Sequence, residues 1–592
     1  RSTLFPYTTL FRSRDALYGG NDKLGMVAQM TNRALPEEYF LASDGNTPLT
    51  EVDTYIGLTG HPDINIVYGG GNGDYDYEAG EYCNPEDNMP IQSNIFVDIN
   101  IDGYPADGGG HINTVYGGGN GVTVTGQTTV FLNIAGEGGG EPLAYDHVGT
   151  IFGGNNKGHL DILSDIILLK GQVNTVYGGC NQGAMIGDKT VTGADGTDYE
   201  HVGSVVRLRD EYTVHNTVDD ITVTTIPTAK VSGAVYGGCR MNGVNHNSLV
   251  LVEGGNHSTA TIFGGSDISG DVGDTSRVVI TNGTHGTNAT VLGDVFGAGN
   301  GNYDYTSGDY AGLRKPYSVH SLVEIQSGTA ANLYAGGYAG PCGVTSMQLE
   351  DGTVTGKVFG GGNMAGTVTS NNLTTTTVDE LGNVTIETIT STTTGTSTVT
   401  MNNGTVSTGI YGGCNNSGDI AGKVLVNING GTVGAIDHLA KIHGGGYGQG
   451  TTTSGNVELN IGVADAASRD DIPLIYGDIY GGSGFGNVNA SATDTTVINF
   501  LNGTLKGKGD NIVYGAIYGG GLGQKAVEDD LGTPDEDESQ PAIEAKVFGK
   551  VYVNISNNDQ ASERCFIDLR EANVFGCNNA NGSPQDSVTV NL

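Results

Sequence analysis

A short phrase recurs along almost the whole chain and limits what this sequence can fold into. It consists of an aliphatic residue, then Tyr or Phe, then two or three small residues, as in Val67-Tyr68-Gly69-Gly70-Gly71. Self-similarity of this kind indicates a repeat architecture. The aromatic positions of the phrase are Tyr68, Tyr116, Phe152, Tyr177, Tyr236, Phe263, Phe296, Phe359, Tyr411, Tyr480, Tyr518 and Phe575.

The spacing of these aromatic residues sets the size of the repeat. Phe152 and Tyr177 lie 25 residues apart, and so do Tyr334 and Phe359. Within the repeat, alternating apolar strands such as 424–428 run into Gly-Thr turns such as 431–432. Three short strands with their turns fill this length, which is too short for a four-stranded propeller blade. We therefore predict an all-β fold, a right-handed parallel β-helix (β-solenoid) with about 25-residue coils and β-hairpin or loop insertions, rather than a propeller or a sandwich.

Stacking of coils assigns structural roles to the repeated residues. The aromatic residues are predicted to form an internal ladder, and the glycines stand where a Cβ would clash or φ must be positive. Asparagine recurs four residues after the aromatic residue, and its amide can bond the equivalent amide above and below. The predicted asparagine ladder comprises Asn72, Asn120, Asn156, Asn181, Asn300, Asn363, Asn415 and Asn579.

The ends and the insertions define the expected domain organisation. Residues 3–13 look like a translated sequencing adapter, so residues 1–13 are set aside as non-native. Residues 14–592 are predicted to form one continuous β-solenoid that is truncated at both ends. Insertions are expected at about 72–92, 187–230, 300–318, 371–398 and 527–542. The second and fourth favour hairpins standing off a coil, and the last favours a solvated acidic loop.

The net charge limits the classes of binding partner, and the cysteine positions bear on disulfide formation. The net charge is −39 with only 26 basic residues, which argues against nucleic acid and anionic membranes as partners. No apolar run is long enough to span a bilayer. Three of the seven cysteines, Cys180, Cys239 and Cys414, occupy a small-residue position of the phrase, so we expect packing roles and no essential disulfide. His443 replaces an aromatic residue of the ladder and is expected in the core.

Two insertions carry the most specific local duplication, because residues 72–82 match residues 300–310. Tyrosine offers an apolar face and a hydroxyl, and aspartate offers acceptors, which together suit sugars or a polypeptide. The alternative is that the rings fold back and cover the edge of a coil. The candidate ligand-contact residues are Asp74, Tyr75, Asp76, Tyr77 and Tyr82 in the first loop and Tyr303, Asp304, Tyr305, Asp309 and Tyr310 in the second.

A calcium site and a catalytic groove are the two alternatives to a ligand-contact role for the loops. Residues 70–76 resemble the nonapeptide of calcium-binding β-rolls, but the Asp placement differs and the repeat is not tandem, so no cofactor is expected and calcium alone stays open. The carboxylates form no recurrent pair, so the sequence predicts no catalytic residues. The catalytic alternative is a polysaccharide lyase or glycoside hydrolase. It would need a groove on one face that gathers two carboxylates with an Arg or Lys.

The Val-Tyr-Gly-Gly-Gly-Asn corner and the Val-x-Val-x-Ile strand resemble extracellular bacterial right-handed parallel β-helix proteins of the adhesin-like repeat type. The resemblance covers about residues 14–592. It implies a non-catalytic secreted or cell-surface protein that presents loops to a glycan or an extracellular protein. It leaves the ligand and the oligomeric state open.

Overall fold

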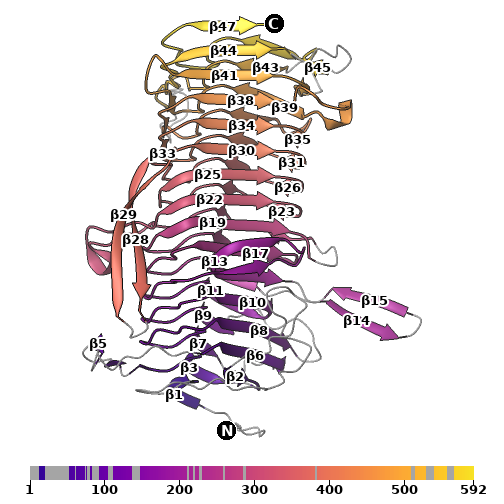
Figure 1. Ribbon diagram of the computed structural model, residues 1–592. Helices are drawn as coiled ribbons and strands as arrows, with labels where there is room; N and C mark the ends of the chain where they lie inside the picture. The colour runs from indigo at the N-terminus through magenta and orange to yellow at the C-terminus, as the bar shows by residue number, and fades with distance from the viewer. Residues whose placement is uncertain are drawn as a thin grey trace, which may run out of the picture. The chain divides into compact units, whose positions relative to one another are not determined.

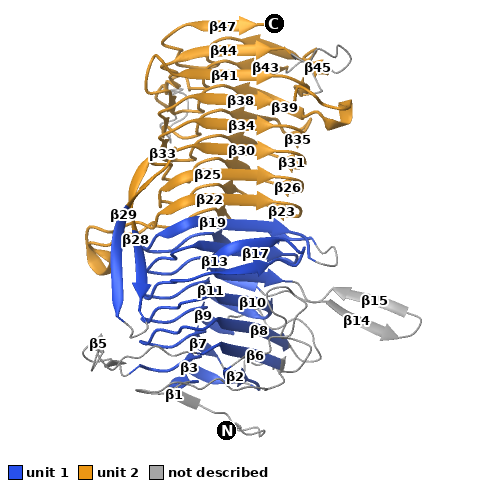
Figure 2. Ribbon diagram, viewed as in Figure 1, with its two compact units in different colours: residues 1–292, 374–389 blue, residues 293–373, 390–592 orange. Residues whose placement is uncertain are grey.

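The structure is a computed structural model, and it divides into two compact units (Figure 2). Unit 1 comprises residues 1–292 and 374–389, and unit 2 comprises residues 293–373 and 390–592. The residues that the structure describes are 12–19, 53–60, 62–73, 75–76, 81–82, 93–104, 111–136, 147–209, 212–217, 220–225, 230–257, 260–283, 288–379, 383–508, 514–527, 539–556 and 566–592.

Each unit has a sheet of long parallel strands, here called the long sheet (Figure 1). In unit 1 its order is β2 (Thr54–Leu58), β6 (Ile95–Tyr104), β8 (Thr128–Gly136), β10 (Ser164–Lys170), β13 (Asp198–Arg209), β17 (Asn247–Glu253) and β19 (Val272–Thr281). In unit 2 it is β22 (Ser318–Ile325), β25 (Cys342–Leu349), β30 (Ser397–Met401), β34 (Val424–Ile428), β38 (Val457–Ile461), β41 (Thr495–Phe500), β44 (Lys550–Ile555) and β47 (Val588–Asn591).

The recurring aromatic phrase ends the strands of a second parallel sheet, here called the aromatic sheet. In unit 1 it contains β1 (Arg12–Tyr18), β3 (Asp63–Tyr68), β7 (Ile112–Tyr116), β9 (Val148–Phe152), β11 (Gln172–Tyr177), β16 (Lys230–Tyr236) and β18 (Thr261–Phe263). In unit 2 it contains β21 (Val295–Phe296), β24 (Leu333–Tyr334), β27 (Lys357–Phe359), β32 (Gly409–Tyr411), β36 (Ala440–His443), β39 (Leu474–Tyr480), β43 (Gly515–Tyr518) and β46 (Ala572–Phe575).

The Gly-Thr turns lead into a third set of short parallel strands in unit 2. They are β23 (Thr329–Ala330), β26 (Thr353–Val354), β31 (Thr405–Val406), β35 (Thr432–Val433), the first residues of β39, β42 (Gly503–Lys506) and β45 (Ile567–Asp568). A three-stranded parallel sheet adds β33 (Ser417–Ile420), β37 (Gly450–Thr453) and β40 (Asn487–Val488). In unit 1 the two-residue strand β20 (Thr290–Val291) bridges to Asn256.

The alternating sequence of the long strands explains where the core lies. Val424, Val426 and Ile428 of β34 are buried, whereas Leu425 and Asn427 between them are half-buried on the outer face. β34 pairs with β38 in register, so residues of similar character stack on one another. Both units are therefore all-β stacks of parallel strands, as the sequence predicts at this level. The described residues contain only two short 3₁₀ turns, η3 (Gly308–Tyr310) and η4 (Arg469–Asp471).

The insertions at 72–92, 187–230 and 371–398 form local strand pairs rather than new layers. β4 (Tyr75–Asp76) pairs with β5 (Glu81–Tyr82), and β14 (Tyr212–Thr217) pairs with β15 (Asp220–Thr225), both antiparallel. β12 (Lys189–Thr192) pairs antiparallel with the start of β13, and β28 (Ser370–Val378) pairs with β29 (Val384–Thr392). We expected the insertions at 187–230 and 371–398 to form hairpins that stand off a coil. Instead, β12 folds back onto the long sheet of unit 1, because it covers an apolar cluster described below.

Candidate functional site

The loop at 300–318, one of the two duplicated insertions, is compact. The rings of Tyr303 and Tyr310 lie edge to face with centroids 5.1 Å apart. Both rings and Tyr305 are half-buried, whereas Asp304 and Asp309 are exposed. The loop therefore presents partly accessible aromatic faces beside carboxylates. This arrangement lies between the two alternatives that the sequence left open, since the rings are neither fully exposed nor fully packed against a strand.

Asp304 holds the second loop together. Its Oδ1 accepts from the backbone N–H of Thr306 at 2.8 Å and from the Thr306 hydroxyl at 2.6 Å, and its Oδ2 accepts from the Ser307 hydroxyl at 2.6 Å. These hydrogen bonds, chiefly those from the Ser307 and Thr306 hydroxyls, lower the pKa of Asp304 well below its ordinary value. Asp304 is thus a positioning residue for the loop, while Asp309 keeps an exposed carboxylate.

The first duplicated loop differs in backbone structure. Tyr75 pairs with Tyr82 and Asp76 pairs with Glu81 in the β4–β5 hairpin, whereas the second loop forms η3. Asp74 and Tyr77 lie outside the described residues, so their predicted contact role stays a prediction. The two loops belong to different units.

The aromatic residues of the phrase stack in both units. In unit 1, ring centroids from Tyr18 through Tyr68, Tyr116, Phe152, Tyr177 and Tyr236 to Phe263 follow at 4.7 to 4.9 Å. In unit 2 they follow at 4.4 to 5.0 Å from Phe296 through Tyr334, Phe359, Tyr411, His443, Tyr480 and Tyr518 to Phe575. These residues build the core, and Phe575 alone among them is exposed, at 46%.

The corner asparagines form a ladder over part of each unit. In unit 1 the amide Nδ2 of Asn120 donates to Asn72 Oδ1 at 2.9 Å, and the pattern continues through Asn156 to Asn181. In unit 2 Asn415 donates to Asn363. Asn300 and Asn579 depart from the prediction, because each donates to a tyrosine hydroxyl, Tyr303 and Tyr480 respectively.

A second asparagine ladder on the outer face of the long sheet was not anticipated. In unit 2, Asn460 donates to Asn427 at 2.9 Å, Asn499 to Asn460 at 2.8 Å, Asn554 to Asn499 at 2.9 Å and Asn591 to Asn554 at 2.8 Å. Its signal was visible in the sequence, since an asparagine holds the same place in each of these Val-x-Val-x-Ile-type strands. In this ladder the side-chain amides of successive strands satisfy one another's hydrogen-bonding groups.

His443 and the corner cysteines lie in the core. His443 stacks between Tyr411 at 5.0 Å and Tyr480 at 4.4 Å, and burial lowers its pKa to about 3. Cys180, Cys239 and Cys414 are buried free thiols, and burial raises the pKa of Cys414 to about 12. With so high a pKa, the Cys414 thiol is unreactive at neutral pH, because the thiolate is the reactive form.

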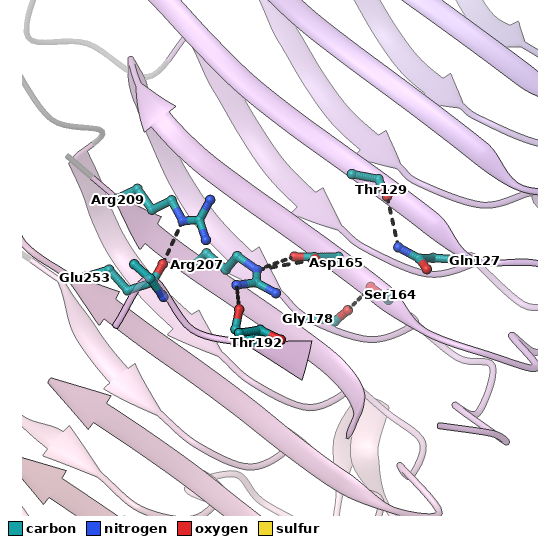
Figure 3. Close-up of polar contacts among 10 residues, drawn as sticks. Gln127, Thr129, Ser164, Asp165, Gly178, Thr192, Arg207, Arg209 and Glu253 are labelled. Carbon is teal, nitrogen blue, oxygen red and sulfur yellow. Dashed lines mark hydrogen bonds and ion pairs between the residues drawn. The ribbon is translucent and has the colours of Figure 1, made fainter. Parts of the chain in front are cut away.

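Sequence spacing did not reveal an ion-pair cluster on the outer face of the long sheet of unit 1 (Figure 3). Arg207 Nε on β13 donates to Asp165 Oδ1 on β10 at 2.9 Å, and its Nη1 donates to the Thr192 carbonyl of β12 at 2.9 Å. Arg209 pairs with Glu253 at 2.7 Å, and Glu253 also accepts from the backbone N–H of Ala194 at 2.6 Å.

The cluster is enclosed rather than open to solvent. The side chain of Arg207 is 1% exposed and that of Asp165 is 5% exposed. Burial lowers the pKa of Arg207, but the attraction of Asp165 and Glu253 outweighs this effect, and the net shift is upward. Arg277 lies over the Tyr199 ring at 4.8 Å, and an apolar cluster that includes Val191, Tyr199 and Leu249 surrounds the site.

This cluster matters for the catalytic alternative, which required two carboxylates and a basic residue on one face. Asp165, Glu253, Arg207 and Arg209 satisfy that composition, and Figure 3 shows their side chains directed at one another. Each carboxylate is paired and each is nearly inaccessible. The chemistry of the cluster is therefore that of an anchor for β12 over the sheet.

Among the residues that the structure describes, no group of three His, Cys, Asp or Glu side chains is arranged to hold a metal ion. The described part of the chain also contains no helix with the length and apolar character needed to cross a membrane. Comparison with models of known protein families and with curated proteins gives no match for this chain.

Proposed function

We propose that this protein is a non-catalytic, secreted or cell-surface structural protein of bacterial origin and adhesin-like type. In this proposal the stacked layers close into a right-handed β-helix, and the insertions contact a glycan or an extracellular protein. The three lines of strands that each layer of unit 2 contributes support the closed helix. Right-handed crossovers are the rule for parallel strands.

The observation that carries the contact role is the Tyr303–Tyr310 pair. The two rings meet edge to face at 5.1 Å, beside the exposed carboxylate of Asp309, on a loop fixed by the hydrogen bonds of Asp304. Partly exposed aromatic rings lose little conformational entropy on binding, and they combine apolar area with a hydroxyl. Such a preordered loop suits a sugar or a polypeptide surface.

An array of glycans and extracellular-matrix proteins tests this proposal. The Tyr303→Ala/Tyr310→Ala variant is expected to bind its array ligand roughly thirtyfold more weakly, since truncating an aromatic anchor costs about 2 kcal/mol. Tyr514→Ala serves as the matched control, because Tyr514 is 48% exposed and lies outside the loop. Unchanged binding by the double variant, or no binding by the unaltered chain, would overturn the contact role.

A further inference from the structure

Strand β29 is a long strand with an open edge. It pairs only with β28 in a two-stranded sheet of the described residues. Its side chains are exposed on both faces, including Val384 at 46%, Ile386 at 64% and Ile389 at 48%. A strand edge of this length leaves backbone N–H and C=O groups without a ladder partner, and it is a template for another strand.

The far edge of β28 is already occupied by side chains of unit 1. Thr376 N–H donates to Asn245 Oδ1 at 3.1 Å, and Asn245 Nδ2 donates back to the Thr376 carbonyl at 2.6 Å. Thr374 N–H donates to Asp271 Oδ2 at 2.9 Å. Residues 374–389 belong to unit 1 (Figure 2). β28 is thus the anchored strand of the hairpin, and the outer edge of β29 is the one that remains open.

The sequence of β29 lacks the features that normally protect an edge. Val-Thr-Ile-Glu-Thr-Ile-Thr-Ser-Thr contains no Pro, Gly or Lys, and Glu387 is its only charged residue. β-Branched residues have the highest strand propensity. Natural edge strands are blunted by lysine, proline, bulges or short length, and β29 contains neither lysine nor proline in its nine residues.

The strand is also complementary to itself. Antiparallel pairing of two full β29 strands, 384 opposite 392, centres on Thr388, which then faces Thr388 of the second chain. Glu387 then faces Ile389, and Ile386 faces Thr390, so no like charges are directly opposed. Thr–Thr pairs across strands are favourable, whereas opposed like charges are not. We propose that two copies of this chain dimerise through antiparallel β29–β29 pairing, which creates a four-stranded sheet about a twofold axis.

Electrostatics makes the strand a suitable place for such contact. The chain carries a net charge of −39, so two copies repel one another in general. β29 contributes a single negative charge, and physiological salt screens more distant charges over about 8 Å. Dimerisation is therefore expected to strengthen as salt is added, which is the opposite of an association driven by salt bridges.

Sedimentation equilibrium over a wide range of protein and salt concentrations tests the dimer. The unaltered chain is expected to reach twice its 61.0 kDa mass. Thr388→Lys places two lysines opposite each other and is expected to return the mass to that of one chain. Ile436→Lys is the matched control, since Ile436 is a 56% exposed isoleucine elsewhere and this variant should still dimerise. A monomer under all conditions, or a dimer that survives Thr388→Lys, overturns the proposal.

Cysteine cross-linking tests the register separately. With Cys83, Cys565 and the exposed Cys577 replaced by serine, Thr388→Cys should form an intermolecular disulfide on mild oxidation. Directly opposed residues of antiparallel strands lie about 4.5–5.5 Å apart at Cα, which is within disulfide range. Thr385→Cys faces Ser391 in this register and should remain a thiol. Equal cross-linking of both variants would overturn the proposed pairing.

Discussion

Glycine has two distinct roles in the repeat, and they rest on different physics. Gly404 of a Gly-Thr turn has φ +89°, a conformation that other residues rarely adopt. Gly117, directly after an aromatic residue of the ladder, has an ordinary φ, but an added Cβ would stand 2.2 Å from the Gly153 carbonyl oxygen of the next layer. The ladder glycine is therefore required by the close approach of stacked backbones alone, whereas the turn glycine is required by its positive φ as well as by such an approach.

The turn glycine gives a direct prediction. Gly404→Ala should lower the free energy of unfolding by about 1–3 kcal/mol, because it adds strain at positive φ and a Cβ 2.5 Å from the Gly352 carbonyl oxygen. Urea denaturation followed by circular dichroism measures the loss. Gly60→Ala is the control for φ strain alone, since Gly60 has φ +75° with no atom within 4 Å of the added Cβ. If both variants lost the same free energy of unfolding, the close contact between the added Cβ and the Gly352 carbonyl oxygen would contribute nothing.

His443 makes the stack sensitive to acid. Its pKa is lowered to about 3 by burial, whereas the unfolded chain has the ordinary value of about 6.5. The unfolded state therefore binds the proton first, so the contribution of this residue is complete above pH 6.5 and is lost as the pH falls toward 3. The expected slope is about 1.4 kcal/mol per pH unit in that window.

His443→Phe is expected to remove this part of the pH dependence, because phenylalanine occupies equivalent ladder positions and does not titrate. Thermal melts of the variant and the unaltered chain between pH 4 and pH 7 provide the comparison. Burial also lowers the pKa of the half-buried His159, to about 4, so a smaller slope remains in the variant. A variant that loses stability with acid as steeply as the unaltered chain would contradict the assignment.

At the scale of elements, β12 is held to the long sheet by charge as well as by apolar contact. Arg207 bridges Asp165 on one strand and the Thr192 carbonyl on β12, while Glu253 accepts from the N–H of Ala194 just beyond it. Burying an ion pair costs solvation, and the pair offsets that cost only when both partners are present. Removal of one partner is therefore more harmful than replacement of both.

Asp165→Asn should destabilise unit 1 by about 3–5 kcal/mol, because it leaves the charge of Arg207 buried without its counterion. Limited proteolysis near 193–197, where β12 turns into β13, should accelerate at the same time. The Asp165→Leu/Arg207→Met variant should recover most of the stability. Asp274→Asn, a change at a 57% exposed carboxylate, is the control and should behave as the unaltered chain. A single variant as stable as the double variant would refute the anchor role.

At the scale of the whole molecule, each layer contacts mainly its neighbours. In such arrays stability is approximately a sum of local terms and nearest-neighbour interfaces. Hydrogen exchange of Asp165→Asn should therefore rise in β10, β13 and β17 and stay unchanged in β34 and β38, which belong to the other unit. A uniform rise across both units would instead indicate a single cooperative unfolding transition.

The sequence by itself determined the repeat, the parallel all-β character and the residues that point inward. Strand alternation and turn glycines are local, and identical layers reproduce the same local pattern, so Tyr68, Tyr116 and their equivalents could be assigned to one stack before any contact was known. The stacking of the corner asparagines could be predicted for the same reason. Asn300 and Asn579 donate to tyrosine hydroxyls instead, and the equivalent position of an adjacent layer is not asparagine in either case: it is Tyr338 after Asn300 and Leu522 before Asn579.

Only the tertiary structure decided what the insertions contact. Asp165 and Arg207 are 42 residues apart, and Asn245 and Thr376 are 131 residues apart. Such pairs depend on which strands become neighbours after insertions of unequal length, and on which way a hairpin folds. Neither quantity is set by local spacing. The conformation of a layer follows from the repeat, because the residues of each layer favour it locally. The positions of β12 and β28 depend instead on hydrogen bonds between their backbone groups and side chains that are distant in the sequence.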